Sequence, residues 1–299
     1  MSPHVMDFPM HPPHSPRSSN AVPPRRPVRI PPYGIIGGGA LAVIAGPYAV
    51  EGRDMLLATA RAVRAAGASL LRGRAFESIG EEGLAVLSEA RAETGLGIVT
   101  EVVDARHVTL RAEHADVLEV GSQNIDNFPL LAEVGRVGKP VLLTRGLTTT
   151  VKELLMAVEH VMSNGNSDLI LCERGVRTLE PSTRFTLDLA TISVLRAETR
   201  LPVIVDPSHA ARRAALVAPL AYAAIAAGAD GLMVEVHPDP AAAVTGGGRP
   251  LTTSAFAELM GGLTAFAAAA GRSVGVAGAA GGGTSYERPC GRHAEWVSM

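Results

Sequence analysis

Short apolar runs recur along the chain between residues 41 and 236, and longer amphipathic stretches separate them. The runs place Val, Ile and Leu at consecutive positions instead of alternating them with polar residues, which is typical of strands covered on both faces. We predict eight such strands, at residues 41–46, 68–72, 97–101, 116–120, 140–144, 168–173, 202–206 and 230–236.

Helical periodicity fills several of the intervals between these strands. Residues 55–67, 81–95 and 151–165 carry apolar side chains at three- and four-residue spacing, and each stretch ends on Gly, a common helix C-cap. Eight strands alternating with helices predict a parallel sheet closed into a (β/α)8 TIM barrel of the α/β class. A doubly wound open sheet is the alternative, which the lack of a G-x-G-x-x-G motif after the first strand disfavours.

Composition divides the chain into three parts. Residues 1–33 are rich in Pro, Ser, His and Arg and are predicted to be a flexible tail, because they cannot bury enough apolar surface to become ordered. Residues 34–270 are predicted to form one TIM-barrel catalytic domain. Residues 271–299 are Gly-rich and are predicted to be a second flexible tail.

Charge and apolar content narrow the possible partners. The net charge is -2 with no basic stripe, which argues against nucleic acid and anionic membranes as partners. No apolar run is long enough to span a bilayer, and the beginning of the chain lacks the apolar core of a secretory signal. Two cysteines do not suggest a disulfide framework. We expect a cytoplasmic homo-oligomer that binds a small molecule.

Polar and ionisable residues gather where the predicted strands end. The seventh strand leads into Asp206, Ser208 and His209, and the eighth into Glu235 and His237. The carboxyl ends of barrel strands converge on one mouth, where such enzymes keep their chemistry. Burying charges that nothing compensates costs free energy, so their accumulation here indicates a function. We predict a site for a small anionic carboxylate or phosphorylated molecule at this mouth.

Arginine supplies the cationic side of this predicted site, because its planar fork holds carboxylate or phosphate bidentately. The alternative for any single Arg is a structural ion pair with Glu101, Glu173 or Asp206. The predicted substrate-binding residues are Arg174, Arg145, Arg72, Gln123, Thr144, Ser208 and His237.

Six stretches of the chain are close to the motifs of one enzyme family. They read VIAGPYAVEG, VGSQNIDNFPLL, KPVLLTRG, GNSDLILCERGVRT, LPVIVDPSHA and AGADGLMVEVHPDP, within about residues 36–263. The chain therefore resembles the short bacterial type I class of 3-deoxy-D-arabino-heptulosonate 7-phosphate (DAHP) synthases. The resemblance implies a TIM barrel, a divalent metal, and the aldol-like condensation of phosphoenolpyruvate with erythrose 4-phosphate that starts the shikimate pathway.

The chain departs from the family pattern at several ligand-facing positions. Of four metal ligands, His209 and Glu235 match, whereas Tyr48 stands in place of a Cys and Gly246 in place of an Asp. Two of the phosphate-holding cations are also replaced, an Arg by Gln123 and a Lys by Thr144, while Arg174 is kept. A basic loop that contacts both phosphorylated substrates in the family is missing from RGRAFESIGEEG.

Because these losses concentrate at the site, the sequence favours a retooled enzyme. We expect aldol-type carbon–carbon bond formation or cleavage, or a related elimination, on a small polyoxygenated carboxylate in a specialised pathway, with no metal cofactor. The expected catalytic residues are His209 as the acid–base, Glu235 and Tyr48 beside it, and Asp206 and Glu173 to orient the groups. The alternatives are a genuine DAHP synthase with a divalent metal (Mn, Fe, Zn or Mg) and a non-catalytic regulatory homologue.

Overall fold

The computed structural model describes residues 25–75, 80–244 and 250–275. Within these residues, eight parallel strands close into a barrel in the order β10-β3-β4-β5-β6-β7-β8-β9, which confirms the predicted TIM-barrel fold. Each strand overlaps one of the predicted apolar runs. The strands are β3 (Ala42–Gly46), β4 (Leu70–Arg72), β5 (Gly97–Val102), β6 (Val117–Val120), β7 (Val141–Thr144), β8 (Leu169–Glu173), β9 (Val203–Val205) and β10 (Gly231–Glu235).

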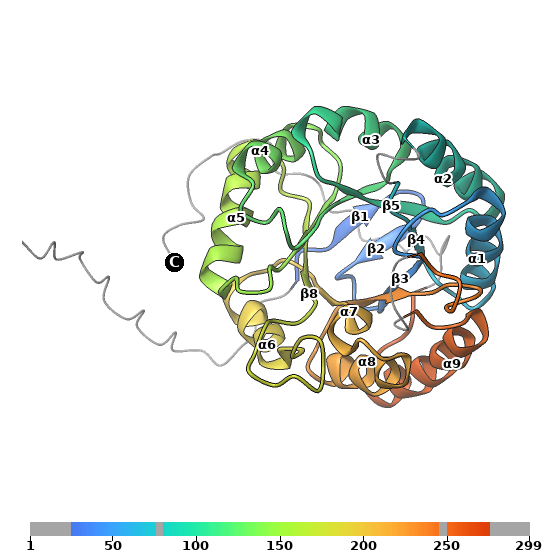
Figure 1. Ribbon diagram of the computed structural model, residues 1–299. Helices are drawn as coiled ribbons and strands as arrows, with labels where there is room; N and C mark the ends of the chain where they lie inside the picture. The colour runs from blue at the N-terminus through green and yellow to red at the C-terminus, as the bar shows by residue number, and fades with distance from the viewer. Residues whose placement is uncertain (1–24, 76–79, 245–249, 276–299) are drawn as a thin grey trace, which may run out of the picture.

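Helices surround the barrel as an outer ring (Figure 1). The three stretches with helical periodicity form α1, α2 and α5, as predicted. The described helices are α1 (Arg53–Ala65), α2 (Gly80–Thr94), α3 (Val108–His114), α4 (Phe128–Arg136), α5 (Val151–Ser163), α6 (Leu189–Glu198), α7 (Pro207–Ala211), α8 (Val217–Ala226) and α9 (Thr253–Ala269), with short 3-10 turns at Ala105–His107 and Ala214–Leu216.

Local sequence determines where α5 begins and where its chain turns back. The Thr150 side chain accepts a hydrogen bond from the Glu153 backbone, and the Glu153 side chain reaches back to the Thr150 backbone, which forms a capping box. Beyond the other end of α5, Gly165 has a φ of +109°, a left-handed conformation that favours glycine. This explains why the helical pattern in the sequence ends on Gly.

Strand alternation divides the core into two parts. In β8, Leu169 and Leu171 pack against the surrounding helices, whereas Ile170 and Cys172 point into the barrel. The same alternation continues past the strand, so that Glu173 follows the outward positions and Arg174 the inward ones. The alternation thus decides which of the polar residues at the strand ends reach the barrel mouth.

A hairpin closes the amino-terminal end of the barrel. Strands β1 (Val28–Ile30) and β2 (Gly34–Ile36) pair antiparallel, and Val28, Ile30 and Ile36 join the residues of the barrel interior in one buried cluster. Figure 1 shows both strands behind the ring, in line with the barrel centre.

This hairpin corrects the predicted boundaries of the tails. Residues 25–33 were assigned to a flexible tail, but their apolar residues fill the bottom of the barrel. At the other boundary, Val274 forms a bridge with Leu41, so residues 271–275 also belong to the fold. The remainder of both predicted tails, residues 1–24 and 276–299, lies outside the described residues. No helix in the described part of the chain has the length and apolarity needed to cross a bilayer.

The hairpin contact predicts the effect of Ile30→Ala. Ile30 is 2% exposed, so its truncation should lower the free energy of unfolding by about 2–5 kcal/mol. For a domain of this size, that loss lowers the melting temperature by on the order of 10 °C. Arg29→Ala, at the exposed neighbouring position, is the matched control and should change stability by less than about 0.5 kcal/mol. Equal melting temperatures for the two variants in a thermal scan would show that the hairpin contributes no packing energy.

Candidate active site

A cavity of about 200 Å³ opens at the carboxyl ends of the barrel strands. Its position agrees with the mouth at which TIM-barrel enzymes keep their active sites. Its lining consists of Tyr48, Arg72, Glu101, Glu119, Gly121, Ser122, Gln123, Leu147, Arg174, Arg184, Phe185 and His209.

His209 is held by a carboxylate next to it in the fold. Asp206 caps the first turn of α7 by accepting a hydrogen bond from the His209 backbone at 3.0 Å, and its other oxygen lies 2.6 Å from His209 Nδ1. Both residues are buried. With Nδ1 engaged by Asp206, Nε2 is left as the atom available to a ligand, and it has no hydrogen-bond partner among the described residues.

The charges of this pair follow from its surroundings. Burial lowers the pKa of His209 despite the opposing effect of Asp206, so the imidazole is neutral near pH 7. Burial alone would raise the pKa of Asp206. The charge and hydrogen bond of His209, together with Arg72 and Arg174, outweigh it and bring that pKa down to about 2. The pair is thus an ionised carboxylate that orients a neutral imidazole.

Glu235 ends β10 at an inward position, and its backbone N–H donates to Ser208 Oγ at 3.0 Å. Burial raises the pKa of Glu235 to about 7, against the attraction of Arg72 and Arg174. This carboxyl group therefore changes charge near neutral pH. Ser208 is completely buried and acts here through the Glu235 backbone instead of lining the cavity.

Arg72 reaches the cavity but is engaged by a carboxylate. Its Nε and Nη2 donate to the two oxygens of Glu119 at 3.0 and 3.1 Å, and Thr144 Oγ1 donates to Glu119 at 3.4 Å. All three residues are buried. Sequence reasoning missed Glu119 because it lies inside the apolar run of a strand. A lone Glu in an otherwise apolar strand is the signal that could have identified it.

Tyr48 is held in the cavity wall by two arginines. Arg74 donates to the Tyr48 hydroxyl at 2.9 Å and pairs with Glu101 at 3.2 Å. The guanidinium carbons of Arg72 and Arg74 lie 5.2 and 5.8 Å from the Tyr48 ring centroid, within cation–π range. The centroid of the His209 ring lies 5.5 Å from that of the Tyr48 ring, so Tyr48 lies beside His209.

Arg174 and Gln123 also line the cavity, as the sequence predicted for substrate-binding residues. Arg174 Nη1 donates to Ser122 Oγ at 2.8 Å. Two further lining residues, Arg184 and Phe185, were not predicted. They lie in the segment between β8 and α6, where no hydrophobic periodicity marks a role for either residue.

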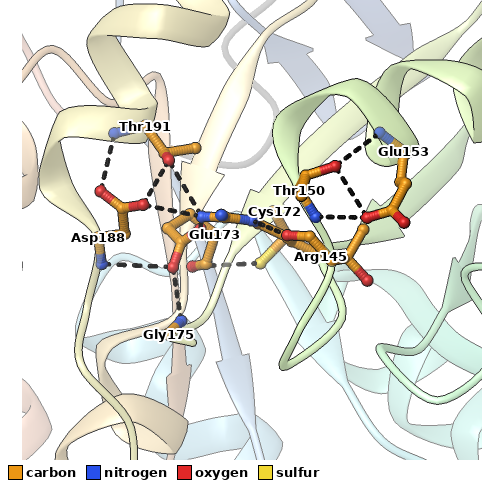
Figure 2. A network of polar contacts seen from close by, with 9 residues as sticks. Arg145, Thr150, Glu153, Cys172, Glu173, Gly175, Asp188 and Thr191 are labelled. Atoms are coloured by element: carbon orange, nitrogen blue, oxygen red, sulfur yellow. Dashed lines mark hydrogen bonds and ion pairs between the residues drawn. The ribbon is translucent and has the colours of Figure 1, made fainter. Parts of the chain in front are cut away.

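Arg145 was predicted to bind the substrate and Glu173 to orient the catalytic groups, but neither lines the cavity. Figure 2 shows the two residues in one polar network with Asp188 and Thr191. Arg145 Nη1 donates to Glu173 at 2.9 Å, to Asp188 at 3.1 Å and to Thr191 at 3.0 Å. Strand alternation is the reason, since both residues stand at outward positions. The structural ion pair, which the sequence left open as the alternative, is the arrangement observed.

His237 is likewise absent from the cavity lining. Its Nε2 lies 3.5 Å from Glu51, and its Nδ1 accepts a hydrogen bond from the Asp239 backbone at 3.1 Å. These contacts connect the chain after β10 to the segment after β3. His237 therefore has a structural role beside the barrel mouth.

The described residues supply two donors suited to a divalent metal. His209 Nε2 is a buried imidazole nitrogen with no hydrogen-bond partner among them, and Glu235 adds an inward carboxyl group. No cluster of three or more His, Cys, Asp and Glu residues that could hold a metal is found in residues 25–75, 80–244 and 250–275. Tyr48 occupies the third position named by the resemblance, and the fourth, Gly246, lies outside the described residues.

Comparisons with known proteins agree on one family. Residues 25–267 match the family described as the DAHP synthetase I family. The phospho-2-dehydro-3-deoxyheptonate aldolase of Thermotoga maritima is 44% identical over 234 residues, which are 75% of this chain and 69% of that protein. The 2-dehydro-3-deoxyphosphooctonate aldolase of Syntrophobacter fumaroxidans is 31% identical, over 75% of this chain and 86% of its own.

Solved structures show the same relationship. A truncated form of the 3-deoxy-D-arabino-heptulosonate 7-phosphate synthase from Thermotoga maritima superimposes with a TM-score of 0.81 and 42% identity, over 84% of this chain and 95% of that one. A crystal structure of the phospho-2-dehydro-3-deoxyheptonate aldolase of the same organism gives a TM-score of 0.82 over 84% of this chain and 76% of its own. The family match, the identity and the shared barrel together show that this chain belongs to the DAHP synthetase I family.

Proposed function

We propose that this chain condenses phosphoenolpyruvate with erythrose 4-phosphate to form 3-deoxy-D-arabino-heptulosonate 7-phosphate. The observation that carries the proposal is the 44% identity with the heptonate aldolase of Thermotoga maritima. Three octonate aldolases are 29–31% identical to this chain, which favours the heptonate as product. The cavity supports an anionic substrate through Arg174 and Arg184.

This proposal replaces the expectation of a retooled enzyme acting in a specialised pathway. That expectation is wrong, because the similarity to a heptonate aldolase extends over 75% of the chain at a high level of identity. It depended on individual replacements such as Tyr48, Gln123 and Thr144. Those replacements leave the cavity cationic on the β8 side, and they leave the Asp206 and His209 pair in place.

The expectation that no cofactor takes part is also contradicted, because the chain belongs to a family of metal-dependent synthases. His209 and Glu235 would hold the metal, since both match ligand positions of the family and both are buried. A bound divalent ion polarises a carbonyl group as a Lewis acid. Two side-chain ligands are fewer than catalytic sites normally use, so we propose weak metal binding.

The condensation requires two proton transfers that residues of the cavity must assist. A carbon–carbon bond forms between the methylene carbon of phosphoenolpyruvate and the aldehyde carbon, water adds its oxygen to the enol carbon, and inorganic phosphate leaves. The aldehyde oxygen therefore needs a proton, and the attacking water must lose one. A Tyr hydroxyl can both accept and donate a hydrogen bond, so Tyr48, which accepts from Arg74, is the proposed proton donor to the aldehyde oxygen. His209, neutral and oriented by Asp206, keeps Nε2 unprotonated, which is the form in which it would hold the metal.

The proposed reaction predicts consumption of phosphoenolpyruvate that depends on erythrose 4-phosphate. With both substrates and excess Mn²⁺, turnover should be on the order of 1 per second or faster, measured by phosphoenolpyruvate absorbance and by mass spectrometry of the product. Chelator should stop the reaction and added metal should restore it. His209→Ala removes the imidazole that would hold the metal and should lose about a hundredfold or more in turnover, whereas Arg29→Ala, at the other end of the barrel, should keep full rate. A folded protein that leaves phosphoenolpyruvate intact under these conditions would contradict the proposal.

Metal affinity should rise with pH, because protons compete with the metal for Glu235. Its pKa of about 7 means that the carboxyl is mostly protonated near pH 6 and mostly ionised near pH 8. Burial lowers the pKa of His209, so its imidazole loses its proton at lower pH than Glu235 does and contributes less to this rise. Titration calorimetry of the metal-free protein with Mn²⁺ should thus show about tenfold tighter binding at the higher pH. In Glu235→Gln, binding should be weaker and nearly independent of pH. A pH-independent affinity of the unaltered protein would refute the assignment of Glu235.

A further inference from the structure

The arginines around the cavity fall into two groups. Arg72 and Arg74, from the β4 side, pair with Glu119 at 3.0 Å and with Glu101 at 3.2 Å. Arg174 and Arg184, on the β8 side, line the same cavity. Neither forms an ion pair with an acidic residue within the described chain. The charge available to an anionic ligand is therefore concentrated on one side of the mouth.

A third arginine is brought to the same rim by contacts between two segments. The Phe185 backbone N–H donates to the Ala210 carbonyl at 3.2 Å, and Arg213 donates to the Ser182 carbonyl at 3.1 Å. These bonds hold the segment that carries Arg184 against the end of α7. Arg212 is the C-cap residue of α7, with a φ of +61°, and it is exposed at this rim.

Arg174 and Arg212 both lie close enough to Arg184 for their charges to act on it. Burial lowers the pKa of Arg184, and the charges of Arg174 and Arg212 lower it further, against weaker opposing effects of Tyr48 and Glu235. Arg212 likewise forms no ion pair with an acidic residue among those described. Three like charges held together repel one another, and a dianionic phosphate relieves that repulsion.

The geometry of Arg184 suits it to bind a phosphate group. Its guanidinium carbon lies 5.1 Å from the Phe185 ring centroid, so the planar fork is stacked on an aromatic face. Phe185 itself is buried and fixed by its backbone bond to α7. An arginine restrained in this way loses less conformational freedom when it binds phosphate bidentately.

We propose that Arg184 and Arg212 form a rim subsite for the phosphate group of the aldose phosphate substrate, an inference that rests on the proposed condensation. Both arginines are exposed, whereas His209, which lines the same cavity as Arg184, is buried. In phosphoenolpyruvate the phosphate sits on the enol carbon, which itself takes up water and adjoins the methylene carbon that forms the new bond. In erythrose 4-phosphate it sits on the carbon farthest from the aldehyde. Erythrose 4-phosphate can therefore place its phosphate at the exposed arginines while its aldehyde extends toward the buried groups, whereas the phosphate of phosphoenolpyruvate must stay beside the reacting carbons.

The test compares Arg184→Ala and Arg212→Gly with the unaltered protein, and Arg29→Ala serves as an exposed control at the other end of the barrel. Glycine suits the left-handed backbone at position 212, so that variant removes the guanidinium without adding strain. Each variant should raise the KM for erythrose 4-phosphate about tenfold and leave the KM for phosphoenolpyruvate within about twofold. Arg184→Lys should fall between, because it keeps the charge and loses the fork.

Calorimetric binding of erythrose 4-phosphate without phosphoenolpyruvate separates this inference from the proposed reaction. Weaker binding in the two variants supports the subsite, even if the unaltered protein does not turn over. The inference is overturned if only the KM for phosphoenolpyruvate rises, if both KM values rise equally, or if binding of erythrose 4-phosphate is unchanged in both variants.

Discussion

The alternation of side chains along closed parallel strands is the constraint on which this site depends. Every strand must present one set of residues to the barrel interior and the other to the helices. The register of β8 sends Cys172 inward and Glu173 outward, and the next residue, Arg174, reaches the cavity. A one-residue shift would exchange the cavity with the helix-facing layer, so the pairing of the strands and the chemistry of the mouth are specified together.

The charges at the strand ends are arranged so that most of them neutralise one another. Arg145 and Glu173 do so beneath the helices, and Arg72 and Glu119 do so inside the barrel. A buried charge without a partner is costly, which is why these pairs are close and hydrogen-bonded. The cavity therefore has two different sides. On the β4 side the arginines are ion-paired with carboxylates, and on the β8 side arginines can bind an anionic ligand.

Membership of the DAHP synthetase I family changes how the replaced residues are understood. Tyr48 is enclosed by the guanidinium groups of Arg72 and Arg74, and Thr144 donates to the carboxylate that holds Arg72. These residues act together within one wall of the cavity. Each replaced side chain therefore works with neighbours that only the fold reveals.

The sequence by itself determined the barrel, because apolar runs without alternation can be buried only by covering both faces. It also placed His209, Asp206 and Glu235 at the strand ends where they are found, since residues directly after a buried strand must lie at the mouth. The sequence could not assign the hairpin at residues 28–36, whose short strands gain their stability from packing under the barrel. It could not separate Arg145 from Arg174, because a strand end does not reveal which face each side chain takes. Arg184 became part of the site only through tertiary structure, where backbone bonds to α7 bring an aperiodic segment over the cavity.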